Sequence, residues 1–187
     1  MIGSSETTAN AVGSAVESSG GETPFGPEKN ASNKEDWETP DDLFRFVDKE
    51  FDFLLDAAST GENAKCEAHL TEEEDGLTTD WHEVCSGLGY PRGAVWLNPP
   101  YGRGIGKWIK KAYEESQKGT IVVVLTFART DTRWWHDWAM KAPEIRLIPG
   151  RITFKGAAGG APAPSCLLIF DEGLRIPRFC VQRLPRK

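Results

Sequence analysis

The apolar run at residues 121–125, Ile-Val-Val-Val-Leu, constrains the fold more than any other feature of the chain. Consecutive apolar residues rich in β-branched side chains predict a strand that is buried on both faces. Similar strands are predicted at residues 53–58, 94–98 and 145–148, with helical patterns between them. Strands that alternate with helices predict an α/β fold, with a mostly parallel sheet and helices on both faces.

Two further strands are expected at residues 151–154 and 166–170, joined by a loop rich in Gly, Ala and Pro. They predict an antiparallel hairpin at one end of the sheet. A helix is expected to begin with Thr39 as its N-cap and Pro40 at its first position, followed by acidic residues. Residues 59–93 are expected to be mostly loop.

The composition divides the chain into a tail and one domain. Residues 1–34 are rich in Gly, Ser, Thr, Glu and Asn and almost lack large apolar side chains, which predicts a disordered N-terminal tail. Residues 35–187 are predicted to form a single domain, for which a hydrophobic content of 39% supplies a core. No apolar run approaches the roughly 20 residues of a membrane span, so no membrane association is expected. The four scattered cysteines indicate a reducing, cytoplasmic location.

The net charge of −6 conceals a strong asymmetry along the chain. Residues 1–36 carry −4, residues 37–101 carry −11 and residues 102–187 carry +9. A basic C-terminal half could contact phosphate groups while the acidic part faces solvent. Folding could equally intermix the two signs, and the sequence leaves both arrangements open.

The tetrapeptide Asn98-Pro99-Pro100-Tyr101 directly follows a predicted strand. Loops at the C-terminal ends of strands bind ligands in open α/β sheets. The Asn98 side-chain oxygen and the Pro99 carbonyl can each accept a hydrogen from an NH2 group on a flat heterocycle, while Tyr101 stacks on the ring. Such acceptors would free the amine lone pair of adenine or cytosine for attack on a methyl sulfonium. The alternative is a Pro-Pro turn at the end of a strand, with a core tyrosine.

A second group of polar residues follows the predicted strand at residues 53–58. Asp56 lies at the end of that strand, and Ala57 and Ala58 keep the following turn small, so that the backbone can approach a ligand. Asn63 and Asp80 lie further along the same edge if the sheet is doubly wound. One acid would suit the ammonium of a bound amino acid and another the hydroxyls of a ribose. A cap of the next segment is the alternative role for Asp56.

Cys66-x-x-His69 and His82-x-x-Cys85 have a spacing that a zinc site could use. The residues between them are acidic and loop-like, and methyl transfer requires no metal. We therefore expect buried thiols and surface histidines, and no bound metal.

The chain resembles the phage DNA N-6-adenine-methyltransferase family, a branch of the S-adenosylmethionine-dependent amino-methyltransferases. The Asn-Pro-Pro-Tyr match marks the whole amino-methyltransferase class, whereas the Trp-x-Thr-Pro and Arg-Thr-Asp-Thr matches are narrower. Ala57-Ala58-Ser59 departs from the wider class, because it replaces a glycine-rich first motif. The matching segments follow the family order over about residues 37–170; they are residues 37–40, 55–58, 63–66, 76–77 with Trp81, 98–102, 108–109, 128–132, 134–136, 150–154 and 164–165.

This resemblance implies a single Rossmann-like methyltransferase domain and S-adenosylmethionine as the cofactor. It implies that residues 98–101 form the catalytic loop and that Trp37, Thr39 and Pro40 close over the methionine part of the cofactor. The resemblance and the polar residues that follow the predicted strand at residues 53–58 together give a set of expected cofactor-binding residues. They are Trp37, Thr39, Pro40, Asp56, Ala57, Ala58, Asn63 and Asp80.

The implied reaction is methylation of the N6 amine of adenine in DNA. Arg129, Arg133 and Arg151 are candidates for contacts to phosphates or bases, although each could equally be a structural arginine. The loop itself would also suit N4 of cytosine, an RNA base or a protein glutamine amide. A non-catalytic DNA-binding module on the same scaffold is a further alternative. Neither the recognition sequence nor the oligomeric state follows from the sequence.

Overall fold

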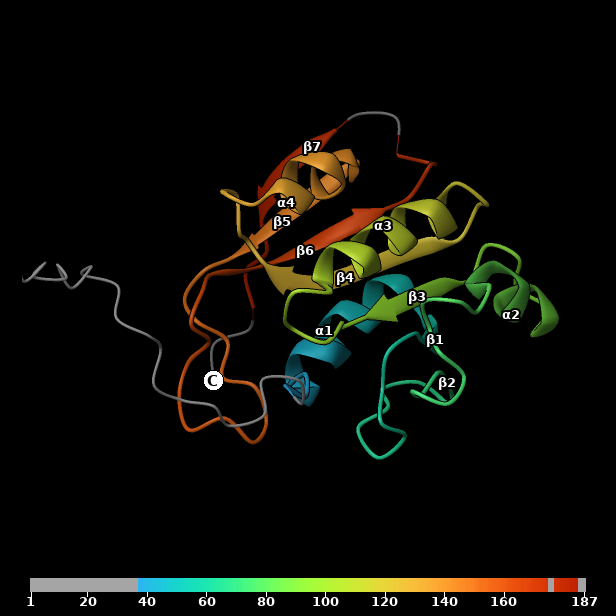
Figure 1. Ribbon diagram of the computed structural model, residues 1–187, viewed down its shortest axis with the longest axis horizontal. Coiled ribbons are helices and arrows are strands. Elements are labelled where there is room, and N and C mark those ends of the chain that lie inside the picture. Colours follow the sequence, from blue (N-terminus) through green and yellow to red (C-terminus); the bar gives the residue numbers. More distant parts are fainter. Residues whose placement is uncertain (1–36, 175–176, 185–187) are drawn as a thin grey trace, which may run out of the picture. The chain divides into compact units, whose positions relative to one another are not determined.

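The computed structural model describes residues 37–174 and 177–184, and the predicted tail at residues 1–34 lies outside them. The described part forms a seven-stranded sheet with the strand order β2-β1-β3-β4-β6-β5-β7 (Figure 1). All neighbouring pairs are parallel except the two that include β6, which is antiparallel to both β4 and β5. The predicted α/β class with a mostly parallel sheet is confirmed. The strands are β1 (Phe53–Asp56), β2 (Ala68–His69), β3 (Ala94–Leu97), β4 (Ile121–Phe127), β5 (Glu144–Ile148), β6 (Ser165–Phe170) and β7 (Arg178–Val181).

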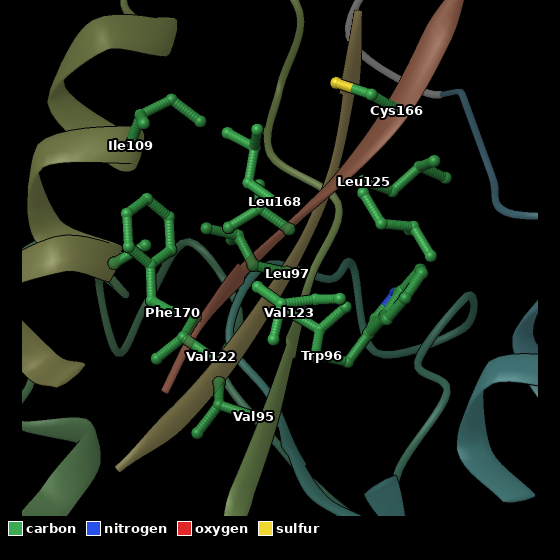
Figure 2. Packing of buried hydrophobic residues seen from close by; sticks show 14 of the residues in the cluster. Val95, Trp96, Leu97, Ile109, Val122, Val123, Leu125, Cys166, Leu168 and Phe170 are labelled. Carbon is green, nitrogen blue, oxygen red and sulfur yellow. The ribbon is translucent and has the colours of Figure 1, made fainter. Parts of the chain in front are cut away.

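Helices cover both faces of the sheet. They are α1 (Asp41–Phe51), α2 (Trp81–Gly87), α3 (Ile105–Ser116), α4 (Arg133–Asp137) and the short 3₁₀ helix η1 (Ala139–Lys141). Phe44 of α1 packs edge-on against the ring of Trp96, with 5.4 Å between the ring centroids. On the opposite face Leu97 points toward Ile109 of α3, as Figure 2 shows. The alternation of side chains along β3 therefore places Trp96 and Leu97 in two separate layers of the core.

The central strands are buried along their full length, as the apolar runs predicted. Every residue of β3 and β6 is buried, and in β4 only Ile121 is partly exposed. Such complete burial is typical of strands that are covered by helices on both faces. The C-terminal ends of β3 and β4 share one edge of the sheet (Figure 1). That edge carries the loop at residues 98–101.

The predicted strand at residues 151–154 is wrong. The antiparallel hairpin consists of β5 and β6, which pair through Ile145 and Leu168, and residues 149–164 connect the two strands. Gly150 has a φ of 82° and turns the chain out of the sheet just after β5. Ile152 and Phe154 are buried because their side chains pack inward from this loop, so the alternating apolar pattern reflects burial without strand pairing.

The expected N-cap of the first helix is also wrong. Helix α1 begins at Asp41, and Pro40 is its N-cap, whose carbonyl accepts a hydrogen bond from Phe44 N at 3.0 Å. Thr39 is instead buried, at 1% exposure. Helix α2, within a stretch expected to be loop, starts at the cap Asp80, whose side chain accepts from Glu83 N at 2.9 Å. An Asp three residues before a Glu is a start signal that the sequence did contain.

No helix within residues 37–174 and 177–184 is long and apolar enough to cross a membrane.

Candidate functional site

A cavity of about 370 Å³ lies at the C-terminal ends of β1 and β3. Its volume suits a small molecule. Three parts of the chain form most of its wall: the segment just before α1, the turn after β1, and the loop after β2. The lining residues are Trp37, Glu38, Thr39, Asp56, Ala57, Ala58, Ser59, Thr60, Asn63, Lys65, Leu70, Thr71, Glu72, Asp75, Gly76, Trp96, Asn98, Pro100 and Trp108.

Asp56 places a carboxylate in the wall of this cavity. Its side chain is held by two backbone amides, with Lys65 N donating to Oδ2 at 2.9 Å and Ala58 N donating to Oδ1 at 3.3 Å. Burial raises the pKa of Asp56 to about 6, although both hydrogen bonds favour the ionised form. A carboxylate can accept about four hydrogen bonds, so capacity remains for a cationic group in the cavity.

Two further polar atoms in the wall are buried without a hydrogen-bond partner among the described residues. They are the hydroxyl of Thr39 and the indole Nε1 of Trp96. An unsatisfied buried donor costs about 1–3 kcal/mol, and native proteins rarely leave one without a reason. Both atoms are fully covered in this conformation, so a polar ligand would reach either of them only after a small shift of the surrounding side chains.

The side chain of Asn98 has a fixed orientation. Its Nδ2 donates to the carbonyl of Trp37 at 2.7 Å, and its Oδ1 accepts from the hydroxyl of Tyr101 at 3.1 Å. These two contacts distinguish the nitrogen from the oxygen of the amide. The Asn98 oxygen keeps a second lone pair for another hydrogen, and both Asn98 and Pro100 line the cavity.

Tyr101 takes a different place from the one predicted. The side chain is 8% exposed and packs on Phe127, with 4.3 Å between ring centroids, and on Trp37, with 5.6 Å between them. Burial raises the pKa of the Tyr101 hydroxyl, which stays protonated and available as a donor to Asn98. The ring is therefore not free to stack on a substrate in this conformation. Its hydroxyl donates to the Asn98 amide oxygen, and its ring packs in an aromatic cluster with Trp37 and Phe127.

The comparisons with known proteins agree with this geometry. The model of the DNA N-6-adenine-methyltransferase (Dam) family matches residues 27–183. The chain belongs to this family. The resemblance in the sequence motifs is thereby confirmed, and residues 98–101, which were predicted to form the catalytic loop, lie within the matched range.

Three relatives share parts of this Dam-family sequence. "Putative methyltransferase YfdM" of Escherichia coli (strain K12) is 42% identical over 66 residues, which are 35% of this chain and 69% of that protein. The DNA N-6-adenine-methyltransferase of Escherichia phage T1 is 30% identical over 138 residues, or 73% of this chain and 54% of the phage protein. The enzyme of the same name from Haemophilus phage HP1 is 27% identical over 149 residues, or 75% and 80% of the two chains. The chain thus spans about half the length of the phage T1 relative.

Most of the predicted cofactor-binding residues of this Dam-family chain lie together, and Asp80 is an exception. Trp37, Thr39, Asp56 and Asn63 all line the cavity, as do Ala57 and Ala58. Pro40 caps α1 immediately beside them. Asp80 instead caps α2 and pairs with Lys118 at 2.8 Å, and it is not among the lining residues.

The sequence reasoning assigned no role to several of the residues that line the cavity, among them Glu72, Asp75 and Trp108. The two acids lie in the loop after β2, a strand of two residues that gave no apolar signal. Trp108 was named only within residues 108–109, a segment that matches the family, and was given no role at the cofactor. Only glycine fits at position 76, where the backbone packs closely against this wall. A Cβ there would lie 2.2 Å from the Ala57 carbonyl oxygen and 3.0 Å from the Trp108 ring.

The predicted DNA-contacting arginines fall into two groups. Arg129 and Arg151 lie exposed in the loops after β4 and β5, and Arg103, which was not among the predicted residues, lies exposed in the loop after β3. These three, called the edge arginines below, pair with no acidic side chain in the described part of the chain. Because β3, β4 and β5 run in the same direction, their loops leave the same edge of the sheet (Figure 1). Arg133 instead lies on α4 and pairs with Asp137 at 3.2 Å.

The cysteine and histidine pairs do not converge on a metal site. Among the described residues no group of three or more His, Cys, Asp or Glu side chains is arranged to hold a metal ion. Burial raises the pKa of Cys66 to about 12 and that of Cys85 to about 11, so both thiols stay protonated at neutral pH. The ring Nδ1 of His82 contacts the hydroxyl of Thr120 at 3.1 Å.

Proposed function

We propose that this chain is a site-specific DNA adenine methyltransferase, which transfers a methyl group from S-adenosylmethionine to the N6 amine of adenine. The observation that carries the proposal is the fixed Asn98 amide, whose oxygen lies at the edge of a cavity that also holds the carboxylate of Asp56. Membership of the Dam family supports adenine as the target base and DNA as the partner.

The residues around the cavity fit S-adenosylmethionine. The ionised Asp56 would accept from its ammonium group, and the unpartnered Thr39 hydroxyl would donate to its carboxylate. Glu72 and Asp75 would accept from the ribose hydroxyls, and Trp108 offers an aromatic face for the adenine ring. When bound, this cofactor supplies an electrophilic methyl group on a sulfonium. The same wall thus offers partners for the ammonium, carboxylate and ribose hydroxyl groups of the ligand.

The chain itself acts on the target amine through hydrogen-bond acceptors. The adenine N6 lone pair is delocalised into the ring, so the free amine is a poor nucleophile. The oxygens of Asn98 and Pro99 would each hold one hydrogen of the NH2 group and favour a tetrahedral nitrogen. These contacts strengthen as positive charge develops on the nitrogen, which stabilises the transition state more than the ground state. The extra proton of the product is then released to water, and no strong base is required.

The DNA would approach along the edge of the sheet that carries the edge arginines. Arginine side chains without acidic partners are free to contact phosphates. A base within a duplex would have to leave the stack to reach Asn98, which costs a few kcal/mol. Since Tyr101 is buried in the aromatic cluster, stacking on its ring is not available to offset this cost in the present conformation.

The test is identification of the methylated product. The protein is incubated with DNA of varied sequence and labelled S-adenosylmethionine, and the DNA is digested to nucleosides for mass spectrometry. The proposal expects label in N6-methyl-2′-deoxyadenosine. Label in N4-methyl-2′-deoxycytidine, or label found only in RNA or protein supplied in parallel reactions, would assign the loop to another NH2 substrate. Calorimetry with the cofactor alone is the control, because a non-catalytic DNA-binding module would show no binding heat.

A further inference from the structure

A short segment at the start of α1 contacts both the Asn98 amide and the cavity. This segment, residues 37–40 together with Asp41, the first residue of α1, is called the strap below. The carbonyl of Trp37 accepts the hydrogen bond from Asn98 Nδ2 at 2.7 Å, and Trp37, Glu38 and Thr39 line the cavity. The orientation of the Asn98 amide therefore depends on where the strap is held.

Two lysines from distant parts of the chain hold the strap. Lys65 Nζ lies 2.9 Å from Glu38 Oε1 and 2.8 Å from Asp41 Oδ1. Lys155 Nζ lies 2.7 Å from Glu38 Oε1 and 2.8 Å from Asp41 Oδ2. The backbone adds a further contact, because Lys155 N donates to the Glu38 carbonyl at 3.0 Å. Each ammonium thus bridges the same two carboxylates.

The two lysines also connect the strap to other parts of the site. The backbone amide of Lys65 donates to Asp56 Oδ2, so one residue contacts both the cavity carboxylate and the strap. Lys155 belongs to the loop that carries Arg151. The hydrogen bonds from Lys155 and Lys65 lower the pKa of Asp41 to about 2, so this carboxylate stays ionised at any working pH.

We propose that Lys65 and Lys155 are positioning residues for the catalytic amide, because they hold the strap whose Trp37 carbonyl fixes Asn98. This inference rests on the proposed function. If the strap moved away, the Asn98 amide could rotate by half a turn and present its NH2 group to the target amine. Because both groups are hydrogen-bond donors, Asn98 could then not bind the target amine. Exposed ion pairs contribute modestly, so loss of the two pairs of Lys155 should slow transfer about 2- to 30-fold.

The test combines hydrogen exchange with single-turnover kinetics on the full chain. Lys155→Met removes the charge but keeps most of the aliphatic stem, and Asp41→Asn breaks the same contact from the other side. Lys110→Met is the matched control, since Lys110 pairs with Glu114 on the exposed face of α3. In the ligand-free protein, exchange at the amide of residue 155 is followed on a peptide spanning residues 152–160.

The proposal expects faster exchange at residue 155 and slower single-turnover methyl transfer, measured at saturating cofactor, in Lys155→Met and in Asp41→Asn. The two effects should combine to less than their product in the double variant, because both changes remove the shared Lys155–Asp41 contact, while each also removes one contact of its own. Lys155→Arg should restore the rate, and Lys110→Met should change neither quantity.

Three results would overturn the inference. Unchanged exchange at residue 155 would show that the ion pairs do not hold the strap. Faster exchange with an unchanged transfer rate would show that the strap does not orient Asn98. A salt dependence of DNA binding reduced by about one phosphate contact, with an unchanged transfer rate, would assign Lys155 to DNA instead. If wild-type protein methylates no DNA, the proposed function fails. The exchange data would still test whether Lys155 and Asp41 hold the strap in place.

Discussion

Asp56 should leave a distinct signature in the pH dependence of stability. Its carboxyl is 2% exposed, and burial raises its pKa from the ordinary 3.8 to about 6. A carboxyl whose pKa rises on folding binds its proton more tightly in the native state than in the unfolded state. Stability from this group is therefore greatest below pH 4, falls as the pH rises toward 6, and is constant at higher pH.

The size of the effect follows from the two pKa values. Between pH 5 and pH 8 this one group should reduce the free energy of unfolding by about 1.4 kcal/mol, of which about 1 kcal/mol is lost between pH 5 and pH 6. Other carboxyls, such as Asp41, have lowered pKa values and act in the opposite direction. A comparison with Asp56→Asn removes their contribution, because they titrate in both proteins.

The assay is urea denaturation of wild type and Asp56→Asn at pH 5, 6, 7 and 8. The difference in unfolding free energy, wild type minus variant, should decrease by about 1.4 kcal/mol from the lowest pH to the highest. The absolute difference also includes the backbone amide that the new side chain fails to satisfy, but that contribution does not depend on pH. A difference that stays flat, or that increases with pH, would refute the assignment of Asp56 as a buried carboxyl with a raised pKa.

Three other predictions concern the cavity and the DNA-facing edge. S-adenosylmethionine should bind about tenfold more weakly at pH 5 than at pH 7, because its ammonium requires the ionised Asp56. Titration calorimetry at both pH values would measure the difference, and an equal affinity would argue against that contact. Gly76→Ala should lower the free energy of unfolding by about 1–3 kcal/mol in the same denaturation assay, because its Cβ would collide with the Ala57 carbonyl. Gly87→Ala is the control and should be neutral or slightly stabilising, because its Cβ would have no atom within 4 Å. Each edge arginine changed to Gln should reduce the slope of log affinity against log salt for duplex DNA by about 0.9, and Arg92→Gln, which removes an arginine before β3 at the opposite edge, should leave the slope unchanged.

The sequence predicted the parts of the fold that depend on local patterns. Residues 121–125 and 94–97 had to be buried strands because they lack polar residues, and Pro99 and Pro100 cannot continue a strand inside a sheet. The positions of Asp56 and Asn98 at one edge then followed from parallel strand order. These are the residues on which the proposed chemistry depends.

The parts that the sequence could not predict depend on contacts between distant segments. Strand β2 has two residues, which are too few to show any periodicity, and the acids Glu72 and Asp75 were missed with it. The alternation of Ile152 and Phe154 matched a strand because a buried loop can share the same period.

Side-chain contacts between distant residues were equally hidden. Tyr101 was expected to face a ligand, but Trp37 and Phe127, which lie far from it in sequence, enclose its ring. The contacts of Lys65 and Lys155 with Glu38 span 27 and 117 positions of the chain, and no local pattern indicates them.

The central claim is that the Asn98 oxygen, held in place by Trp37 and Tyr101, activates the target amine. Single-turnover methyl transfer by Asn98→Ala, with cofactor binding measured on the same sample, tests it most directly. We expect a rate at least about 100-fold lower than wild type, with cofactor affinity unchanged within twofold. Transfer at a rate near that of wild type by Asn98→Ala would contradict it.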